Sequence, residues 1–327
     1  MKSPFTGKEM QLVYEKRTWN FRGEPYEYVH TAWSCADSGE KFTTDEMDDT
    51  GFLQVSNQYR VKYGIPFTDE IVAVRAKYGV SASRMSLILG IGVNQWRHYE
   101  AGEVPSVSNG RMIRSIMNPE VFRDYVRSAR NLFGEKEYDR LLSGIDSIIS
   151  KGSDSEVYDS ARVFQCERGL TNGFAPQSLC RLKNVLLYVL EKSGEVFCTK
   201  MNKLLFYIDF LAYRRYGMAV TGLSYKALDY GPVPERWDRV YSQFDEIVQE
   251  PRRYGDKEGS VLVSTCRADM EQFSSSELEI IEEVCAAFSD LTSVCLSDMS
   301  HKEEAWLQCR NDHKRISFEY AFQLKAI

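Results

Sequence analysis

Residues 201–237 read MNKLLFYIDFLAYRRYGMAVTGLSYKALDYGPVPERW. Apolar and aromatic residues recur with helical spacing in the first half, which predicts an amphipathic helix over Thr199–Tyr216. A short β-like run, Leu223–Leu228, follows. Gly231–Pro234 then reads as a rigid turn, because proline fixes φ and glycine admits backbone that other residues avoid. We expect most of these aromatic side chains to be core, with a few left outside for a partner.

The whole chain has the size and composition of a folded multidomain protein. Its 327 residues exceed one ordinary domain, and 43% are hydrophobic and 13% aromatic. Forty-one Lys and Arg against 47 Asp and Glu give a net charge of −6, which excludes a protein that coats nucleic acid along its whole length. Residues 58–116 are basic by contrast, with eight Lys or Arg against four Asp or Glu. This local excess favours DNA binding for that segment alone.

Cysteine usage and hydropathy predict the compartment. None of the eight cysteines belongs to a Cys-x-x-Cys pair, and most lie in apolar runs, as reduced buried thiols do in the cytoplasm. The chain shows no signal-peptide pattern, and no apolar run approaches the roughly 18 residues that span a membrane. We therefore expect a cytoplasmic protein without a membrane partner.

Periodicity and turn residues divide the chain into four parts. Residues 1–57 carry two β-rich runs around a hairpin turn at Arg22–Pro25, and residues 58–116 read as short helices. Residues 117–174 form a helical connector and linker, and residues 175–327 form a larger α+β domain. The expected fold class is thus multidomain, mainly α with small β elements.

The first part has the spacing of two zinc knuckles without their ligands. Ser3, Thr6 and Ser38 stand at three of the four ligand positions, and only Cys35 remains. The layout resembles the zinc-binding half of MqsA-type antitoxins in degenerate form. Because structural zinc needs four soft ligands, we expect no bound metal, and we expect the hydroxyls to hydrogen-bond backbone amides of the turns. A small β-hairpin module with a coincidental cysteine is the alternative.

Residues 71–105 carry the pattern of a small helical core with Gly90 in a tight turn. The run Tyr99-Glu100-Ala101-Gly102 and the spacing before it resemble the helix-turn-helix repressors of the Cro and lambda type. In that family the third helix, Val93–Ala101 here, enters the major groove of DNA. Trp96 and Tyr99 are expected to point inward.

The resemblance assigns DNA binding to the outward residues of this helix, namely Val93, Asn94, Gln95, Arg97 and His98. Asn and Gln can read adenine, and Arg can read guanine or contact phosphate. Ala82 and Gly92 depart from the family's usual Gln and Ser or Thr, which weakens phosphate positioning. Repressors of this class bind operator DNA as dimers, so a homodimer is expected. The alternative is a scaffold or dimer element, and the apolar stripe of residues 118–150 suits either core packing or a dimer seam.

Three blocks follow one another in the C-terminal part. They are the helix segment KLLFYIDF at residues 203–210, the pattern Tyr-x-Ala-x-x-x-Gly-Pro-Val at residues 225–233, and Ser-His-x-x-x-x-Trp at residues 300–306. Together they resemble the Panacea, or SocA-like, antitoxin domain over about residues 180–310. The resemblance implies neutralisation of a cognate protein toxin, by direct binding or by delivery to a protease. We expect His301 or Trp306 to close the core over the turn through a hydrogen bond.

Interface hot spots are most often aromatic residues or arginine. The candidate toxin-contact residues are therefore Tyr207, Tyr213, Arg214, Tyr225, Tyr230 and Trp237. We expect no catalytic residue and no cofactor, because His301 has no nucleophile motif beside it and the chain has no phosphate-binding glycine loop. A transcriptional regulator or a proteolytic adaptor of a mobile element, without a directly inhibited toxin, is the alternative function.

Overall fold

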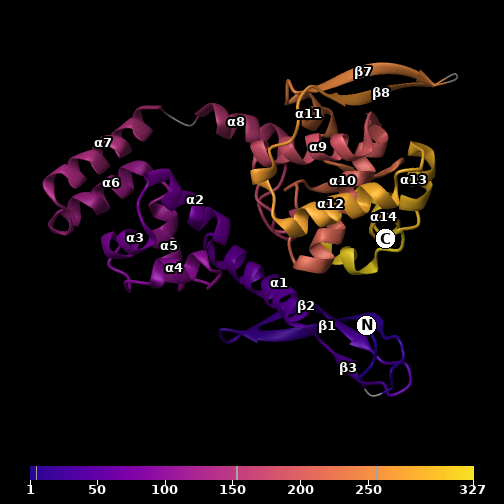
Figure 1. Cartoon of the computed structure of the whole chain (residues 1–327), viewed down its shortest axis with the longest axis horizontal. Helices are drawn as coiled ribbons and strands as arrows, with labels where there is room; N and C mark the ends of the chain where they lie inside the picture. Colours follow the sequence, from indigo (N-terminus) through magenta and orange to yellow (C-terminus); the bar gives the residue numbers. More distant parts are fainter. Residues whose placement is uncertain (5, 152–153, 255–256) are drawn as a thin grey trace. The chain divides into compact units, whose positions relative to one another are not determined.

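The computed structural model describes residues 1–4, 6–151, 154–254 and 257–327. The chain forms two compact units, one made of residues 1–55 and 157–327 and the other of residues 56–156. The described residues are mainly helical with three small antiparallel sheets (Figure 1), which confirms the expected fold class at that level. The linker expected over residues 151–156 includes residues 152 and 153, which lie outside the described residues.

The N-terminal part of the first unit is a β-hairpin packed on a helix. Strands β1 (Gln11–Phe21) and β2 (Glu24–Ser34) pair antiparallel across their full length, and β3 (Lys41–Phe42) extends the sheet. The turn residues Arg22 and Gly23 both have positive φ, +54° and +85°, as the tightest hairpin turns require. The expected hairpin is therefore confirmed, with a turn of two residues.

Helix α1 (Asp45–Tyr63) is fixed to this sheet by one amide side chain. Gln54 Oε1 accepts a hydrogen bond from the backbone N–H of Val29, and Gln54 Nε2 donates to the carbonyl of the same residue, both at 3.0 Å. A buried amide that mimics a strand partner in this way fixes the register of helix against strand.

The hairpin module is joined to the C-terminal part of the same unit at the end of helix α10 (Cys198–Tyr216). Thr50 Oγ1 donates to the carbonyl of Arg215 at 2.6 Å. Gly217 ends α10 with φ +68°, and a β-carbon there would lie 3.1 Å from the carbonyl oxygen of Thr50. The rings of Tyr14 and Phe322 also pack together, with centroids 5.6 Å apart. Residues 1–55 and the C-terminal domain thus form one packed body.

The second unit is built from short helices around one apolar core. Its helices are α2 (Thr68–Tyr78), α3 (Ala82–Ile88), α4 (Gln95–Glu100), α5 (Val107–Ser115), α6 (Pro119–Ser128) and α7 (Glu135–Lys151). Trp96 and Phe122 are fully buried in the core, and Ile145 of α7 is almost fully buried. The apolar stripe of residues 118–150 therefore packs on the core formed by the short helices of residues 68–115, one of the two alternatives that the sequence allowed. Its helix is broken in two, with the break between Ser128 and Glu135.

In the C-terminal part of the first unit, α10 belongs to a group of three packed helices (Figure 1). The other two are α9 (Leu179–Ser193) and α12 (Ser275–Ala287); α12 contacts both α9 and α10, and it begins with a capping box of Ser274 and Glu277. A sheet of β4 (Val196–Phe197), β8 (Lys257–Ser264) and β7 (Ile247–Tyr254) lies beside them. The remaining elements are α8 (Asp154–Val163), α11 (Trp237–Ser242), α13 (Ser293–Ser300), α14 (Glu304–Leu307) and five short 3-10 turns. No helix in the described part of the chain is long and apolar enough to cross a bilayer.

The segment Gly231–Pro234 corrects a prediction. It forms strand β6, which pairs with β5 (Tyr225–Leu228), and the two-residue turn between them is Asp229-Tyr230. Proline is tolerated because β6 is an edge strand of a two-stranded sheet, so its missing N–H breaks no ladder bond on that side. The sequence placed the turn two residues too late.

Candidate functional site

The β5–β6 hairpin presents the most exposed aromatic side chain in the described residues. Tyr230, at the turn, is 76% exposed. Gly231 follows it with φ +100°, a conformation that favours glycine. A β-carbon on Gly231 would clash with Ser300 Oγ and would lie 2.8 Å from Cε of Lys203. The backbone of the hairpin therefore rests directly on buried side chains of two helices.

Lys203 of α10 holds the hairpin from below. Its side chain is almost completely buried, and Nζ donates to the carbonyl of Pro232 at 2.8 Å. Burial lowers the pKa of Lys203 to about 7, because the charged ammonium loses its hydration there. An amine placed under a backbone carbonyl fixes the position of β6.

Three side chains from the C-terminal end of the chain hold the hairpin from its sides. Ser297 Oγ of α13 donates to the carbonyl of Tyr230 at 3.0 Å, and Trp306 Nε1 of α14 donates to the carbonyl of Leu228 at 2.7 Å. His313 Nδ1 lies 3.0 Å from the carbonyl of Ala227. The expected bond from Trp306 is confirmed, while the ring of His301 packs against that of Trp306 with centroids 4.2 Å apart. These contacts hold both ends of the turn.

Asp209 of α10 organises the chain that leads into β5. Its carboxylate accepts hydrogen bonds from the backbone N–H groups of Val220 and Thr221, each at 2.8 Å, from the Thr221 hydroxyl, and from the Tyr225 hydroxyl at 2.6 Å. The side chain is fully buried, and burial raises the pKa of the carboxyl despite these four donors. A buried carboxylate with four donors has a structural role, because it fixes the positions of the residues that donate to it.

These contacts bring the three sequence blocks together at one hairpin. Residues 201–307 match the family model described as antitoxin SocA-like, Panacea domain. No curated protein and no solved structure matches the chain. The family match contains all three blocks and does not reach the N-terminal module or the short helices of the second unit, whose resemblances stay predictions.

Within the matched residues 201–307, three tyrosines that were expected at the contact surface are buried. Tyr207 and Tyr225 are fully buried and Tyr213 is 2% exposed. Their hydroxyl or ring contacts explain why: Tyr207 donates to Glu303 Oε1 at 3.2 Å, Tyr225 donates to Asp209, and Tyr213 packs on Phe318. Tyr207 and Tyr213 belong to α10, a helix that is buried on nearly all sides, and Tyr225 belongs to strand β5; helical spacing alone does not reveal this burial.

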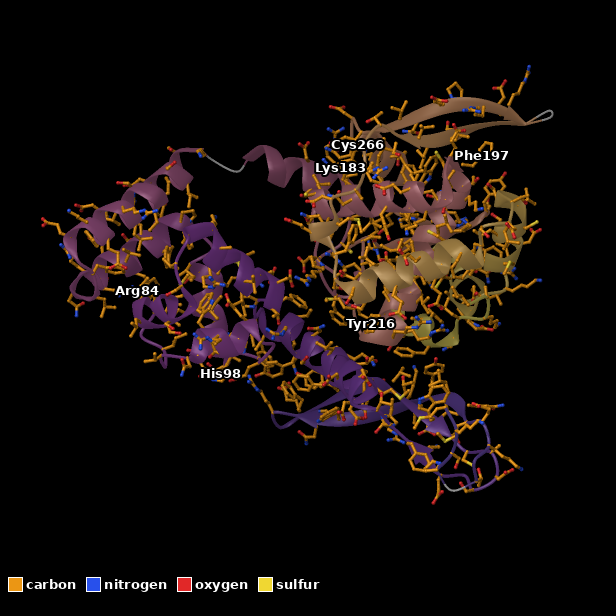
Figure 2. The ribbon with its side chains drawn as sticks, in the orientation of Figure 1. Arg84, His98, Lys183, Phe197, Tyr216 and Cys266 are labelled. Atoms are coloured by element: carbon orange, nitrogen blue, oxygen red, sulfur yellow. The ribbon has the colours of Figure 1, made fainter. Side chains whose placement is uncertain are left out.

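The other three expected contact residues reach the surface to different degrees. Tyr230 is widely exposed and Trp237, at the start of α11, is 38% exposed. Arg214 is half-buried, and its Nη2 donates to the carbonyl of Ile327 at 2.9 Å. Tyr216 in Figure 2 marks the end of α10, where the N-terminal module packs. Sequence reasoning missed Asp229, which precedes Tyr230 in the turn, and it missed Ser297 and His313, which reach the hairpin only through tertiary contacts.

Helix α4 of the second unit shows the orientation expected of a recognition helix. Trp96 and Tyr99 are buried, whereas Asn94, Arg97 and His98 are exposed (His98 is labelled in Figure 2). Val93 is 57% exposed, and half-buried Gln95 donates to Glu103 Oε1 at 3.0 Å. The helix is shorter than expected, so Val93 and Asn94 precede its first turn.

Glu100 fixes α4 on the core of the second unit. Its Oε1 accepts from Trp96 Nε1 at 2.9 Å and pairs with Arg75 Nε at 2.5 Å. Asn109 Nδ2 donates to the hydroxyl of Tyr99 at 2.8 Å. The exposed side chains of α4 are thus carried on a rigid frame.

The two N-terminal turns that contain Ser3 and Ser38 are held by hydroxyl groups, as expected. The backbone N–H of Thr6 donates to Ser3 Oγ at 3.3 Å, and that of Glu40 to Ser38 Oγ at 3.4 Å. Thr6 Oγ1 lies 3.3 Å from Cys35 Sγ. Hydrogen bonds from Ser38, and next from Thr6, lower the pKa of the Cys35 thiol to about 6. The described residues contain no group of three or more His, Cys, Asp or Glu side chains placed to hold a metal ion.

Proposed function

We propose that this chain is an antitoxin whose C-terminal domain binds and neutralises a cognate protein toxin. The observation that carries the proposal is the match of residues 201–307 to the antitoxin SocA-like, Panacea domain. The geometry supports it, because all three sequence blocks build and support one hairpin that presents an exposed aromatic residue.

We propose that the domain binds its target without catalysis. The polar groups of the three blocks are engaged in holding the fold: Asp209 accepts four hydrogen bonds, and Lys203 donates to a backbone carbonyl. Ser300 is fully buried and donates to the carbonyl of Ser297 at 2.8 Å. A nucleophile or a base must reach its substrate, and these groups face the interior.

The second unit supports a further role in repressing the chain's own operon. Exposed Asn94, Arg97 and His98 on a rigid helix, in a segment with an excess of positive charge, are suited to the major groove. A homodimer on a palindromic operator is the proposed form, because one helix in one groove gives modest affinity. Eight free cysteines support a cytoplasmic location for this work.

Co-expression with the product of the flanking gene tests the proposal. The full chain should restore growth to cells that express this product, and the two proteins should elute as one stoichiometric complex in size-exclusion chromatography. A product that stays toxic and uncomplexed would contradict the antitoxin function.

Two other functions give different results in the same system. A proteolytic adaptor would accelerate degradation of the flanking product by an ATP-dependent protease in vitro, whereas a direct inhibitor would leave its half-life unchanged or longer. A transcriptional regulator without a toxin would shift its promoter fragment while the flanking product proves harmless. Direct neutralisation is the function that the hairpin geometry favours.

A further inference from the structure

Two exposed hydrophobic side chains belong to the hairpin turn and to the helix that contacts it. Tyr230 is 76% exposed and Val294 is 61% exposed, and these are the two most exposed large hydrophobic side chains of the described residues. The bond from Ser297 Oγ to the carbonyl of Tyr230 brings α13 against the turn. Val294 stands one helical turn before Ser297 and therefore lies on the same side of α13.

Two carboxylates border this pair. Asp229 precedes Tyr230 in the turn, with its side chain 85% exposed, and Asp298 follows Ser297 on the exposed surface of α13. Among the described residues, neither carboxylate has a Lys or Arg nitrogen within 4.0 Å, and Asp229 faces only the imidazole of His313 at that distance. We define the turn patch as Asp229, Tyr230, Val294 and Asp298. It combines hydrophobic surface with two carboxylates that form no ion pair with a described Lys or Arg.

The turn patch is also rigid. The hairpin rests on Lys203 and Ser300, and its two ends are held by Ser297 and Trp306. A preformed surface loses little conformational entropy when a partner binds, so more of the contact energy appears as affinity. Exposed hydrophobic residues that are grouped and bordered by polar groups mark an interaction site more often than residues scattered singly.

We propose that the turn patch is the docking site for a basic, arginine-bearing segment of the toxin. The inference rests on the proposed antitoxin function and names the surface and the chemistry that carry it. An arginine guanidinium would stack on the ring of Tyr230 and pair with Asp229 or Asp298, while its aliphatic stem would lie against Val294. The negative charge of the patch is complementary to the positive charge of such a segment, because the two carboxylates form no ion pair with a described Lys or Arg of this chain.

Substitutions in the full chain test the inference against the co-expressed flanking product. Tyr230→Ala and the double change Asp229→Asn with Asp298→Asn should each raise the dissociation constant at least about tenfold, which corresponds to one hot-spot contact. The double Asn variant should also lose most of the salt dependence of association, because its contribution is electrostatic. Unchanged unfolding midpoints would show that the variants are folded.

Matched changes elsewhere on the same domain serve as controls. Val248→Ala removes a 40% exposed valine from β7, and Asp245→Asn neutralises an exposed aspartate; both should bind as wild type. Wild-type-like affinity in all turn-patch variants would overturn the inference and leave the antitoxin function intact. A wild-type chain that neither binds nor restores growth would instead contradict the function itself, and the docking site with it.

Discussion

At the scale of single residues, Gly231 is a position where both the backbone conformation and the packing require glycine. Its φ of +100° and the contacts that a β-carbon would make with Ser300 and Lys203 both oppose any side chain. We expect Gly231→Ala to lower the free energy of unfolding by about 2–4 kcal/mol, the sum of backbone strain and overpacking. Urea unfolding of the full chain measures this loss.

Gly79 offers a matched control for that change. It also has positive φ, +63°, but a β-carbon there meets nothing within 4 Å. Gly79→Ala should therefore cost about 1 kcal/mol, the conformational part alone. Equal losses in the two variants would show that the contact with Ser300 and Lys203 carries no energy.

Lys203 predicts a pH dependence of stability. Its pKa is about 7 in the folded protein and near the ordinary value of 10.5 in the unfolded chain, so between these values the unfolded state binds more protons. The contribution of Lys203 to stability should therefore rise as pH rises from 7 toward 10.5, and should be constant below 7. In Lys203→Met this increment is absent, so the difference in free energy of unfolding between wild type and variant should grow with pH. Parallel profiles from urea titrations at pH 7, 8 and 9 would contradict this.

At the scale of elements, α4 is the helix that carries the proposed DNA binding. Arg97 is exposed at its centre, and the amide of Gln95 is held beside Glu103. Each base contact contributes about 1–3 kcal/mol, so Arg97→Ala with Gln95→Ala should weaken the shift of the promoter fragment by about a hundredfold or more. Neutralisation of the toxin should remain, because residues 201–307 are unchanged.

The control for α4 is Val72→Ala on helix α2, a 39% exposed residue outside the expected reading surface. It should leave the gel shift at the wild-type protein concentration. If the double variant shifts DNA as wild type does, α4 is a scaffold element, the alternative that the sequence allows.

Prediction of elements from the sequence succeeded where a local signal decides. The helix expected over Thr199–Tyr216 is α10, and Gly217 in left-handed conformation ends it. Strand β7 was missed, and β6 was read as a turn, because Pro232 and Pro234 look like turn residues when the neighbouring strand is unknown. Edge position is a tertiary property, so a local reading of proline cannot include it.

At the scale of the whole molecule, the N-terminal module belongs to the same compact unit as the C-terminal domain. Thr50→Val removes the hydroxyl that donates to the carbonyl of Arg215 and leaves the shape of the side chain unchanged. The loss should be about 1 kcal/mol in the free energy of unfolding, typical of one buried hydrogen bond. Thr18→Val on the exposed surface of β1 is the control and should be neutral within about 0.5 kcal/mol. A Thr50→Val variant as stable as wild type would show that this bond does not join the two parts.

The sequence by itself determined the helix over residues 199–216, the N-terminal hairpin, the inward side of α4 and the family to which residues 201–307 are similar. These follow from spacing and local chemistry, which act within a few residues. Tertiary structure alone decided which tyrosines reach the surface. Tyr207 and Tyr213 are buried because α12, α13 and the last residues of the chain pack on α10, and Tyr225 is buried because β5 packs on Asp209 and Phe318. Tyr230 stays outside because Lys203 and Ser297 hold its turn there. Burial depends on partners that are distant in the sequence. Helical periodicity therefore predicts the helix within Met201–Trp237 but not which side chains of the segment reach the surface.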